Sequence, residues 1–495
     1  MAEDLAGRAE QLWTALSRAR YRVWAGLEAR PGLERIFEAF PELFREDALA
    51  AVVEAEKELG DEAAMRQRRL RAFLLAMRGE RAAVGVVERR LAWEAETVLR
   101  LGEELVPFRQ VGVEQAEEED VERRWALEDA RLAALREVEA LDRERLERVW
   151  EAWGSATGTG YLAAWEEANG ITLEPLAGEA RWLLRETEDL YRELLRDELT
   201  RSLAGVRPGS VRAVDGLRLG RASRFDGHFA GLDPVDVARR QLGELGLSLE
   251  AGGRVRLEQE ARAGGLARPF CVAIQVPGEV VLSFVPRSGW RDWPGFFHGL
   301  GHARHFAGTD PGLPFEDRAL GDWSVAEAWA GLFERLTWNP VWLARYVGLR
   351  GGARKDYCRA AVLGDLLRLR RAAARLLYEL ELHRAGRFEG MPGLYAELLT
   401  EATGLRHDPA GYLDEVEPDL YVVRRLRGRA LEASVAHVLR ETYDEDWFRN
   451  PRTGPYLEEL FSSGHREEAE SVARRVAGEG LSFARVVAAY AEVVG

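Results

Sequence analysis

The sequence predicts a large, mainly α-helical protein that contains one small β-sheet, and three observations support this class. From the N-terminus to about Leu203, prolines are sparse and apolar residues recur at three- and four-residue spacing, as in amphipathic helices. Two short β-branched runs, 270–276 and 280–285, then flank Pro277-Gly278, which is typical of a hairpin. From Trp293 onward the helical spacing returns and continues to the end of the chain.

The change of pattern near residue 205 predicts two lobes. Residues 206–210 contain Pro208-Gly209 and are typical of a turn or linker. We therefore expect an N-terminal helical lobe over residues 1–205 and a second lobe, which contains the hairpin, over residues 206–495. The length agrees with this division, because 495 residues exceed what a single small core needs.

Composition and charge exclude several classes of function. The net charge of -15 argues against nucleic-acid binding driven by phosphate neutralisation, which requires a basic face. No run approaches the roughly 18 apolar residues of a membrane span, and the acidic N-terminus is not followed by an apolar signal core. Two cysteines, Cys271 and Cys358, cannot form a disulfide framework. We expect a cytoplasmic protein that binds neither nucleic acid nor membranes.

Three histidines, His298, His302 and His305, fall within eight positions. On a helix, His298 and His302 are one turn apart and project from the same face. Two imidazoles in this arrangement can reach one zinc ion at about 2.0–2.1 Å. Alone, the His-x-x-x-His spacing belongs more often to packed or surface histidines than to a metal site. Further ligands are needed to support the metal interpretation.

Acidic residues downstream supply such ligands. Glu327 and Glu334 are seven positions apart in an apolar, helix-like stretch, so both carboxylates face the same way. One can complete a zinc site, which needs a third protein ligand, and the other can support a ligand by a hydrogen bond. Asp322, at the start of the stretch, is a further candidate for such support.

Residues 298–305, His-Gly-Leu-Gly-His-Ala-Arg-His, resemble the His-Glu-x-Gly-His-x-x-His signature of the oligoendopeptidase F and thimet oligopeptidase family of zinc metallopeptidases. The resemblance covers about residues 213–495. It implies a two-lobed helical metallopeptidase fold that binds short peptides in a channel between the lobes. It also implies that His298 and His302 bind one zinc ion, with Glu327, 25 residues after His302, as third ligand. Glu334, His305 and Asp322 would then support these ligands.

The resemblance extends to both sides of the histidines. The strand that carries Val280, Leu282 and Phe284 is similar to the sheet on the substrate side of the family's site, and we expect its edge to pair with a peptide backbone. Residues 417–421 resemble the family's tyrosine-bearing segment. Tyr421 is therefore a candidate donor to the oxyanion of the reaction.

Two positions depart from the family pattern. Gly299 stands where the family has the glutamate that accepts a proton from the zinc-bound water and passes it to the leaving amine. Such general acid–base catalysis contributes roughly 10²–10⁴ in rate. Arg425 stands where close relatives carry a second tyrosine, and its pKa above about 12 prevents ready proton donation. Zinc binding and peptide hydrolysis are therefore separate expectations for this chain.

Three interpretations remain open. The first is a family member that binds zinc and short peptides but is inactive or strongly impaired in hydrolysis. The second is an active zinc oligopeptidase with a substituted base, for which Glu316 and Asp317 are candidates because they lie between the two metal-bearing stretches. The third is a metal-free helical scaffold for a protein partner.

Overall fold

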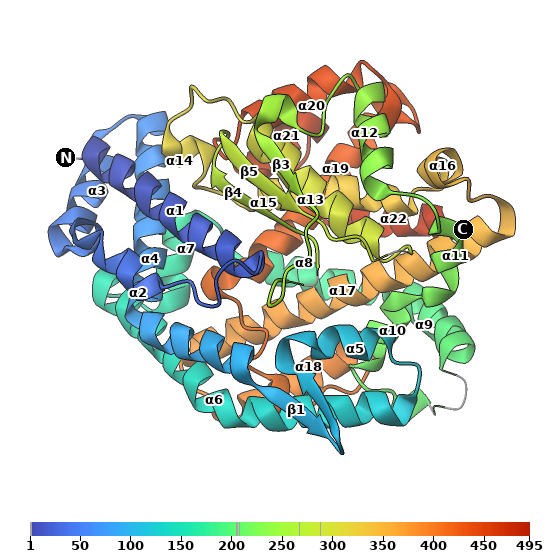
Figure 1. The fold of residues 1–495 in the computed structure, drawn as a ribbon. Coiled ribbons are helices and arrows are strands. Elements are labelled where there is room, and N and C mark those ends of the chain that lie inside the picture. The colour runs from blue at the N-terminus through green and yellow to red at the C-terminus, as the bar shows by residue number, and fades with distance from the viewer. Residues whose placement is uncertain (1, 204–205, 207, 267, 288) are drawn as a thin grey trace.

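The computed structural model describes residues 2–203, 206, 208–266, 268–287 and 289–495, and helices dominate it (Figure 1). The helices before residue 204 are α1 (Ala2–Trp24), α2 (Leu33–Glu38), α3 (Glu46–Glu58), α4 (Asp61–Glu96), α5 (Val111–Glu117), α6 (Val121–Thr157), α7 (Tyr161–Asn169), α8 (Leu173–Glu186) and α9 (Glu188–Ser202). The expected lobe boundary at 205/206 adjoins residues 204–205 and 207, which lie outside the described residues. The division into two lobes therefore stays a prediction.

Helices also make up most of the remaining chain. They are α10 (Asp215–Arg221), α11 (Asp226–Phe229), α12 (Pro234–Glu244), α13 (Asp292–Gly308), α14 (Phe315–Arg318), α15 (Ser324–Glu334), α16 (Pro340–Trp342), α17 (Gly351–Ala385), α18 (Met391–Thr403), α19 (Tyr421–Tyr443), α20 (Thr453–Ser462), α21 (Ala469–Ala477) and α22 (Ala484–Val494). In Figure 1, α17 crosses the middle of the molecule, with α13 and the small sheet above it and α6 and α18 below it. Within the described ranges, no helix combines the length and hydropathy that a bilayer crossing requires.

The predicted hairpin forms two strands of a three-stranded sheet. β4 (Phe270–Gln275) pairs antiparallel with β5 (Glu279–Ser283), as the sequence predicted. β3 (Val255–Glu258) pairs with β5 in parallel, so the strand order is β3-β5-β4. The sequence analysis did not predict β3, nor the separate hairpin of β1 (Val98–Leu101) and β2 (Glu104–Pro107). Each of these strands is four residues long, which is the shortest run in which alternation of apolar and polar residues indicates a strand.

The sheet lies between two helices, and its alternating side chains explain why. Val281 of β5 packs in a small cluster with Tyr21 of α1 and with residues of β4. Its neighbours Val280 and Leu282 point the other way, into the main core that includes α13. The ring centres of Phe284, just after β5, and Phe296 of α13 are 4.8 Å apart. The sheet thus supports the helix that carries the three histidines.

The central position of β5 makes the expected peptide pairing with this strand wrong. Residues 280–283 pair with β3 on one side and β4 on the other, so the backbone of β5 has no free edge in the described sheet. Val280, Leu282 and Phe284 are each 0% exposed. A peptide cannot reach these side chains, which form part of the core beneath α13.

Two glycines allow α15 to pack closely against α13 and α19. A Cβ atom on Gly301 of α13 would lie 2.4 Å from the carbonyl oxygen of Trp329 in α15. A Cβ atom on Gly428 of α19 would lie 2.6 Å from Cβ of Glu327 in α15. Real Cβ atoms do not approach other atoms this closely, so larger residues would push the helices apart. Gly301 therefore brings the candidate ligands of α13 and α15 within reach of each other, and Gly428 brings α19 against Glu327.

Candidate metal centre

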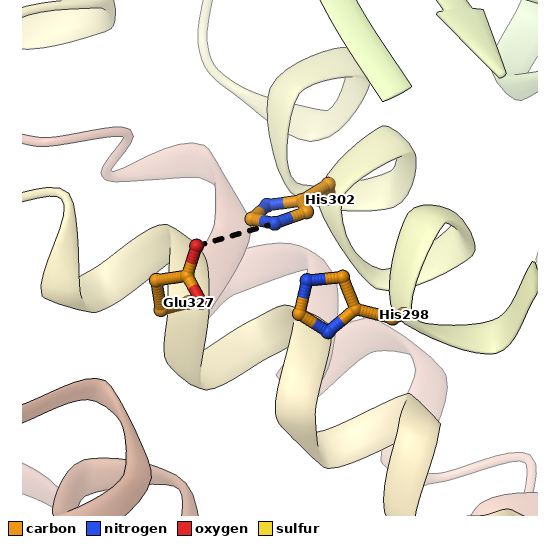
Figure 2. Close-up of side chains that lie close together, drawn as sticks. All are labelled: His298, His302 and Glu327. Atoms are coloured by element: carbon orange, nitrogen blue, oxygen red, sulfur yellow. Dashed lines mark ion pairs between the residues drawn. The ribbon is translucent and has the colours of Figure 1, made fainter. Parts of the chain in front are cut away.

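His298, His302 and Glu327 converge at the contact between α13 and α15 (Figure 2). One ligand atom from each of the three residues lies within 4.8 Å of the others. Oε1 of Glu327 is 3.7 Å from Nε2 of His302. The sequence prediction that these three side chains come together is therefore confirmed, whereas metal binding by them stays a prediction.

The chemistry of the three residues fits a zinc ion. Two imidazoles and one carboxylate form a ligand set of catalytic zinc sites, in which a water takes the fourth position. Zinc–ligand bonds of about 2.0–2.1 Å in a tetrahedron place the ligand atoms about 3.4 Å apart. Side-chain movements on the order of 1 Å would bring the three ligand atoms to this separation. His302 also lacks a hydrogen-bond partner in the described part of the chain: its buried Nδ1 has none, and Nε2 lies too far from Glu327.

Glu334 orients one of the two histidines. Its Oε2 lies 2.9 Å from Nδ1 of His298. A proton on Nδ1 donates to this carboxylate, which leaves the lone pair of Nε2 for a metal ion. Arg368 of α17 donates to the other oxygen of Glu334 at 3.0 Å and so holds the carboxylate in place. This supporting position is the one that the sequence predicted for Glu334.

Tyr421 contacts the third candidate ligand directly. Its hydroxyl donates a hydrogen bond of 2.6 Å to Oε1 of Glu327. The guanidinium of Arg425, one turn further along α19, lies 5.3 Å from the centre of the Tyr421 ring and donates to Glu417 at 2.9 Å. In this arrangement the tyrosine hydroxyl orients Glu327, a role that the sequence analysis did not assign to it.

Burial and neighbouring charges shift the pKa values of the cluster. Burial disfavours the charged form of His298, but the hydrogen bond and the charge of Glu334 outweigh it and raise the pKa. Burial and the nearby His298 lower the pKa of His302 to about 4. Burial would raise the pKa of Glu327, yet the two histidines and the Tyr421 hydrogen bond lower it. At neutral pH, His302 is a neutral imidazole and Glu327 a carboxylate, which are the forms that bind metals.

Two predicted supporting residues act on the helices rather than on the ligands. His305 is 0% exposed, and its Nε2 donates to the carbonyl of Gly464 at 3.2 Å. Asp322 accepts hydrogen bonds from the backbone of Ser324 at 3.0 Å and from Arg427 of α19 at 2.9 Å. His305 thus anchors α13 to the segment after α20, and Asp322 ties the start of α15 to α19. Their expected contacts with the candidate ligands are not found among the described residues.

Gly299, at the position of the missing base, lies beneath a leucine from the sheet. A Cβ atom at this position would lie 2.7 Å from Cδ1 of Leu282. Apart from its chain neighbours and the backbone of its own helix, no other atom of the described residues lies within 4 Å of that point. The space beside Gly299 is therefore occupied by an apolar side chain and does not hold a substitute acid.

Of the two acids considered as substitute bases, Asp317 is held elsewhere. Asp317 is 1% exposed and forms ion pairs with Arg66, at 2.9 Å, and with Arg69 of α4. Glu316 is 7% exposed, and burial raises its pKa. An acid fixed by two arginines is not free to accept a proton at the histidine cluster. Nothing in the described geometry gives Asp317 the role of a base.

Comparisons with known proteins find the same fold in solved structures. No protein-family model matches the chain, and no curated protein sequence matches it. Solved structures do match over nearly the whole length. They include BsuCP (14% identity, 99% of this chain, 98% of that chain, TM-score 0.64), an M32 carboxypeptidase of Deinococcus radiodurans R1 (14%, 99% of each chain, TM-score 0.60) and metallocarboxypeptidase 1 of Trypanosoma cruzi (16%, 99% of each chain, TM-score 0.54).

These similarities establish the fold and no more, because the sequences are only 14–16% identical. The chain has the large helical fold of metallopeptidases, as the sequence predicted. Two of the structural neighbours named above carry the name carboxypeptidase or metallocarboxypeptidase, and none of the three carries the name oligoendopeptidase F or thimet oligopeptidase. The resemblance to that particular family stays a prediction from the sequence motif.

Proposed function

We propose that this protein binds one zinc ion through His298, His302 and Glu327, binds short peptides beside it, and hydrolyses them very slowly or not at all. The convergence of the three side chains supports the metal site. When bound, zinc lowers the pKa of a coordinated water toward about 7 and polarises a carbonyl group. Gly299 has no side chain to accept the proton of that water or to protonate a leaving amine, so peptide cleavage lacks its proton carrier.

The part of a peptide that binds at this site distinguishes a carboxypeptidase-like protein from an oligoendopeptidase-like one. We propose that the site binds the free C-terminal carboxylate of a peptide, as the metallocarboxypeptidase names of the structural neighbours suggest. Arg368 and Arg425 support this proposal because their side chains are 58% and 44% exposed and contact Glu334 and the Tyr421 ring. Each guanidinium can donate to a carboxylate of the ligand.

Binding of matched peptides tests this proposal. A fluorescent peptide with a free C-terminus should bind the zinc-loaded protein at least several-fold more tightly than the same peptide with a C-terminal amide. Arg425→Gln should reduce this preference, and Arg387→Gln, whose side chain is 72% exposed and pairs only with Glu389 among the described residues, should leave it unchanged. Equal affinity for the acid and the amide would instead favour an oligoendopeptidase-like channel.

A hydrolysis assay tests the proposed lack of activity. Purified protein is stripped with a chelator, reloaded with zinc and mixed with a quenched fluorescent peptide. We expect the wild type to release no more product than the His298→Ala variant. Turnover that requires zinc and is lost in His298→Ala would contradict the proposal and favour an active enzyme with an unidentified base. Absence of both zinc binding and peptide binding would favour the metal-free scaffold.

A further inference from the structure

Leu282 fills the space through which a side chain at position 299 would have to pass. The Cβ position of residue 299 is 2.7 Å from Cδ1 of Leu282, well inside the 3.5–4.0 Å of an ordinary contact between carbon atoms. We propose that Gly299 and Leu282 act as a pair, and that shortening Leu282 makes room for a general base at position 299. This inference rests on the proposed function only where it concerns catalysis.

The surroundings of Leu282 leave it little room to move. The residue lies in the central strand, paired with Cys271 of β4 and Leu257 of β3, so its backbone is fixed on both sides. Its side chain is 0% exposed and belongs to the main core. Such cores are close-packed, so a displaced methyl group has to move against other core atoms.

The helix on the other side of the contact is also fixed. Gly301 brings α13 against α15 so closely that its Cβ position is 2.4 Å from the carbonyl oxygen of Trp329. Moving α13 away from Leu282 would therefore disturb the contact that brings the histidines to Glu327. The clash at position 299 has to be relieved at the leucine.

Only one atom blocks this position, which makes the pair testable. Leu282→Ala removes Cδ1, the single atom near the Cβ position outside α13 among the described residues. In the present protein, Leu282 lies against Gly299, the position at which the peptidase signature carries its carboxylate. Leu282 is thus a second determinant of the inactive state, beside Gly299.

A stability experiment on the metal-free protein tests the packing part of this inference. Alanine normally raises the stability of a helix when it replaces an interior glycine. We expect Gly299→Ala instead to lower Tm by a few °C, on the order expected for a strained core contact. Leu282→Ala should lower Tm by leaving a cavity, and the double variant should lose clearly less than the sum of the two shifts. Gly85→Ala is the matched control, because its position in α4 has nothing within 4 Å, and it should not lower Tm.

A hydrolysis experiment tests the catalytic part. With zinc bound, Gly299→Glu combined with Leu282→Ala should cleave a quenched peptide at least about 10²-fold faster than Gly299→Glu alone, the lower range of a general base. Leu282→Ala alone should not cleave it.

Two stability results would overturn the inference: a rise of Tm in Gly299→Ala like that in Gly85→Ala, or additive Tm shifts when Gly299→Ala and Leu282→Ala are combined. Two hydrolysis results would also overturn it: equal rates for Gly299→Glu with and without Leu282→Ala, or no cleavage by the zinc-loaded variant that combines Gly299→Glu with Leu282→Ala. If the protein bound no zinc, the proposed function would fail. The alanine series, which is measured with a chelator present, would still decide whether the two residues are coupled.

Discussion

Glu334 contacts Nδ1 of His298 and thereby determines which nitrogen of this histidine faces the candidate metal centre. Carboxylates in this position raise the basicity of the ligand, and their loss typically weakens metal binding by about 10–100-fold. We expect Glu334→Gln to weaken zinc binding by a factor in that range, as measured by competition with a fluorescent chelator. Glu389→Gln, at a site 90% exposed, is the control. An unchanged zinc affinity in Glu334→Gln would show that His298 does not need this partner.

Glu379 of α17, a buried acid outside the candidate metal centre, makes the stability of the protein depend on pH. Its side chain is 0% exposed, and burial raises the pKa to about 7 although Arg375, at 2.9 Å, opposes the shift. Between the ordinary value of about 4.3 and this value, the folded state binds more protons than the unfolded state, so stability falls as the pH rises.

Glu379→Gln removes this titration. The Tm of the variant relative to the wild type should therefore increase between pH 5 and pH 7, as measured by thermal unfolding at several pH values. A difference in Tm that stays constant across this range would contradict the assignment.

Single residues also show how much of the site the sequence could predict. Helix geometry was sufficient to put His298 and His302 on one face, whereas the choice of Glu327 as their partner came from the resemblance to the metallopeptidase signature. The contact of Leu282 with Gly299 could not be predicted, because it joins a strand to a helix and depends on how the sheet sits beneath α13. The hydrogen bond from Tyr421 to Glu327 spans 94 positions and has the same origin in tertiary packing.

Among the elements, α15 matters most because it packs against α13 and α19 at two glycines. Gly301→Ala and Gly428→Ala place a methyl group 2.4 Å and 2.6 Å from atoms of α15. Overpacking of this kind typically costs about 1–3 kcal/mol. We expect each variant to lower the free energy of unfolding by about that amount in denaturant titrations.

Gly85, at an open helical position, provides the comparison for Gly301→Ala and Gly428→Ala. Gly85→Ala should raise the free energy of unfolding by up to about 1 kcal/mol, since nothing lies within 4 Å of its Cβ position. If Gly301→Ala and Gly428→Ala were as stable as Gly85→Ala, the close approach of the three helices would be refuted.

For the sheet, two strands could be predicted from the sequence but their order could not. The two β-branched runs around Pro277 correctly predicted β4 and β5. The order of the strands was not accessible, because β3 is four residues long and joins β5 from an earlier part of the chain. For this reason the sequence analysis treated a central strand as an edge and gave its core residues a role in peptide binding.

At the scale of the whole molecule, the helical fold was predictable because apolar periodicity survives extensive sequence change. The structural neighbours share the fold over 99% of this chain at 14–16% identity. The proposed binding of a peptide C-terminus depends on a few side chains beside the candidate metal centre, which periodicity does not report. Arg425 was assigned to that region by the sequence motif, whereas Arg368 could be assigned to it only from the structure.

Zinc should stabilise the whole fold if the three ligands bind it. A ligand that binds only the folded state, present at 100 times its Kd, adds about 2.7 kcal/mol to the free energy of unfolding. We expect Tm to rise when zinc is added to the chelator-treated wild type, as measured by calorimetry. His298→Ala should show no such rise. An equal rise in both proteins would place the zinc elsewhere.

The metal content of the purified protein tests the central claim most directly. After dialysis against zinc and removal of free metal, elemental analysis should find about one zinc ion per wild-type chain, as expected for a single three-ligand site. His302→Ala and Glu327→Gln, purified in the same way and folded by circular dichroism, should contain almost none. A wild type without zinc, or variants with as much zinc as the wild type, would contradict the assignment of His298, His302 and Glu327 as a metal centre.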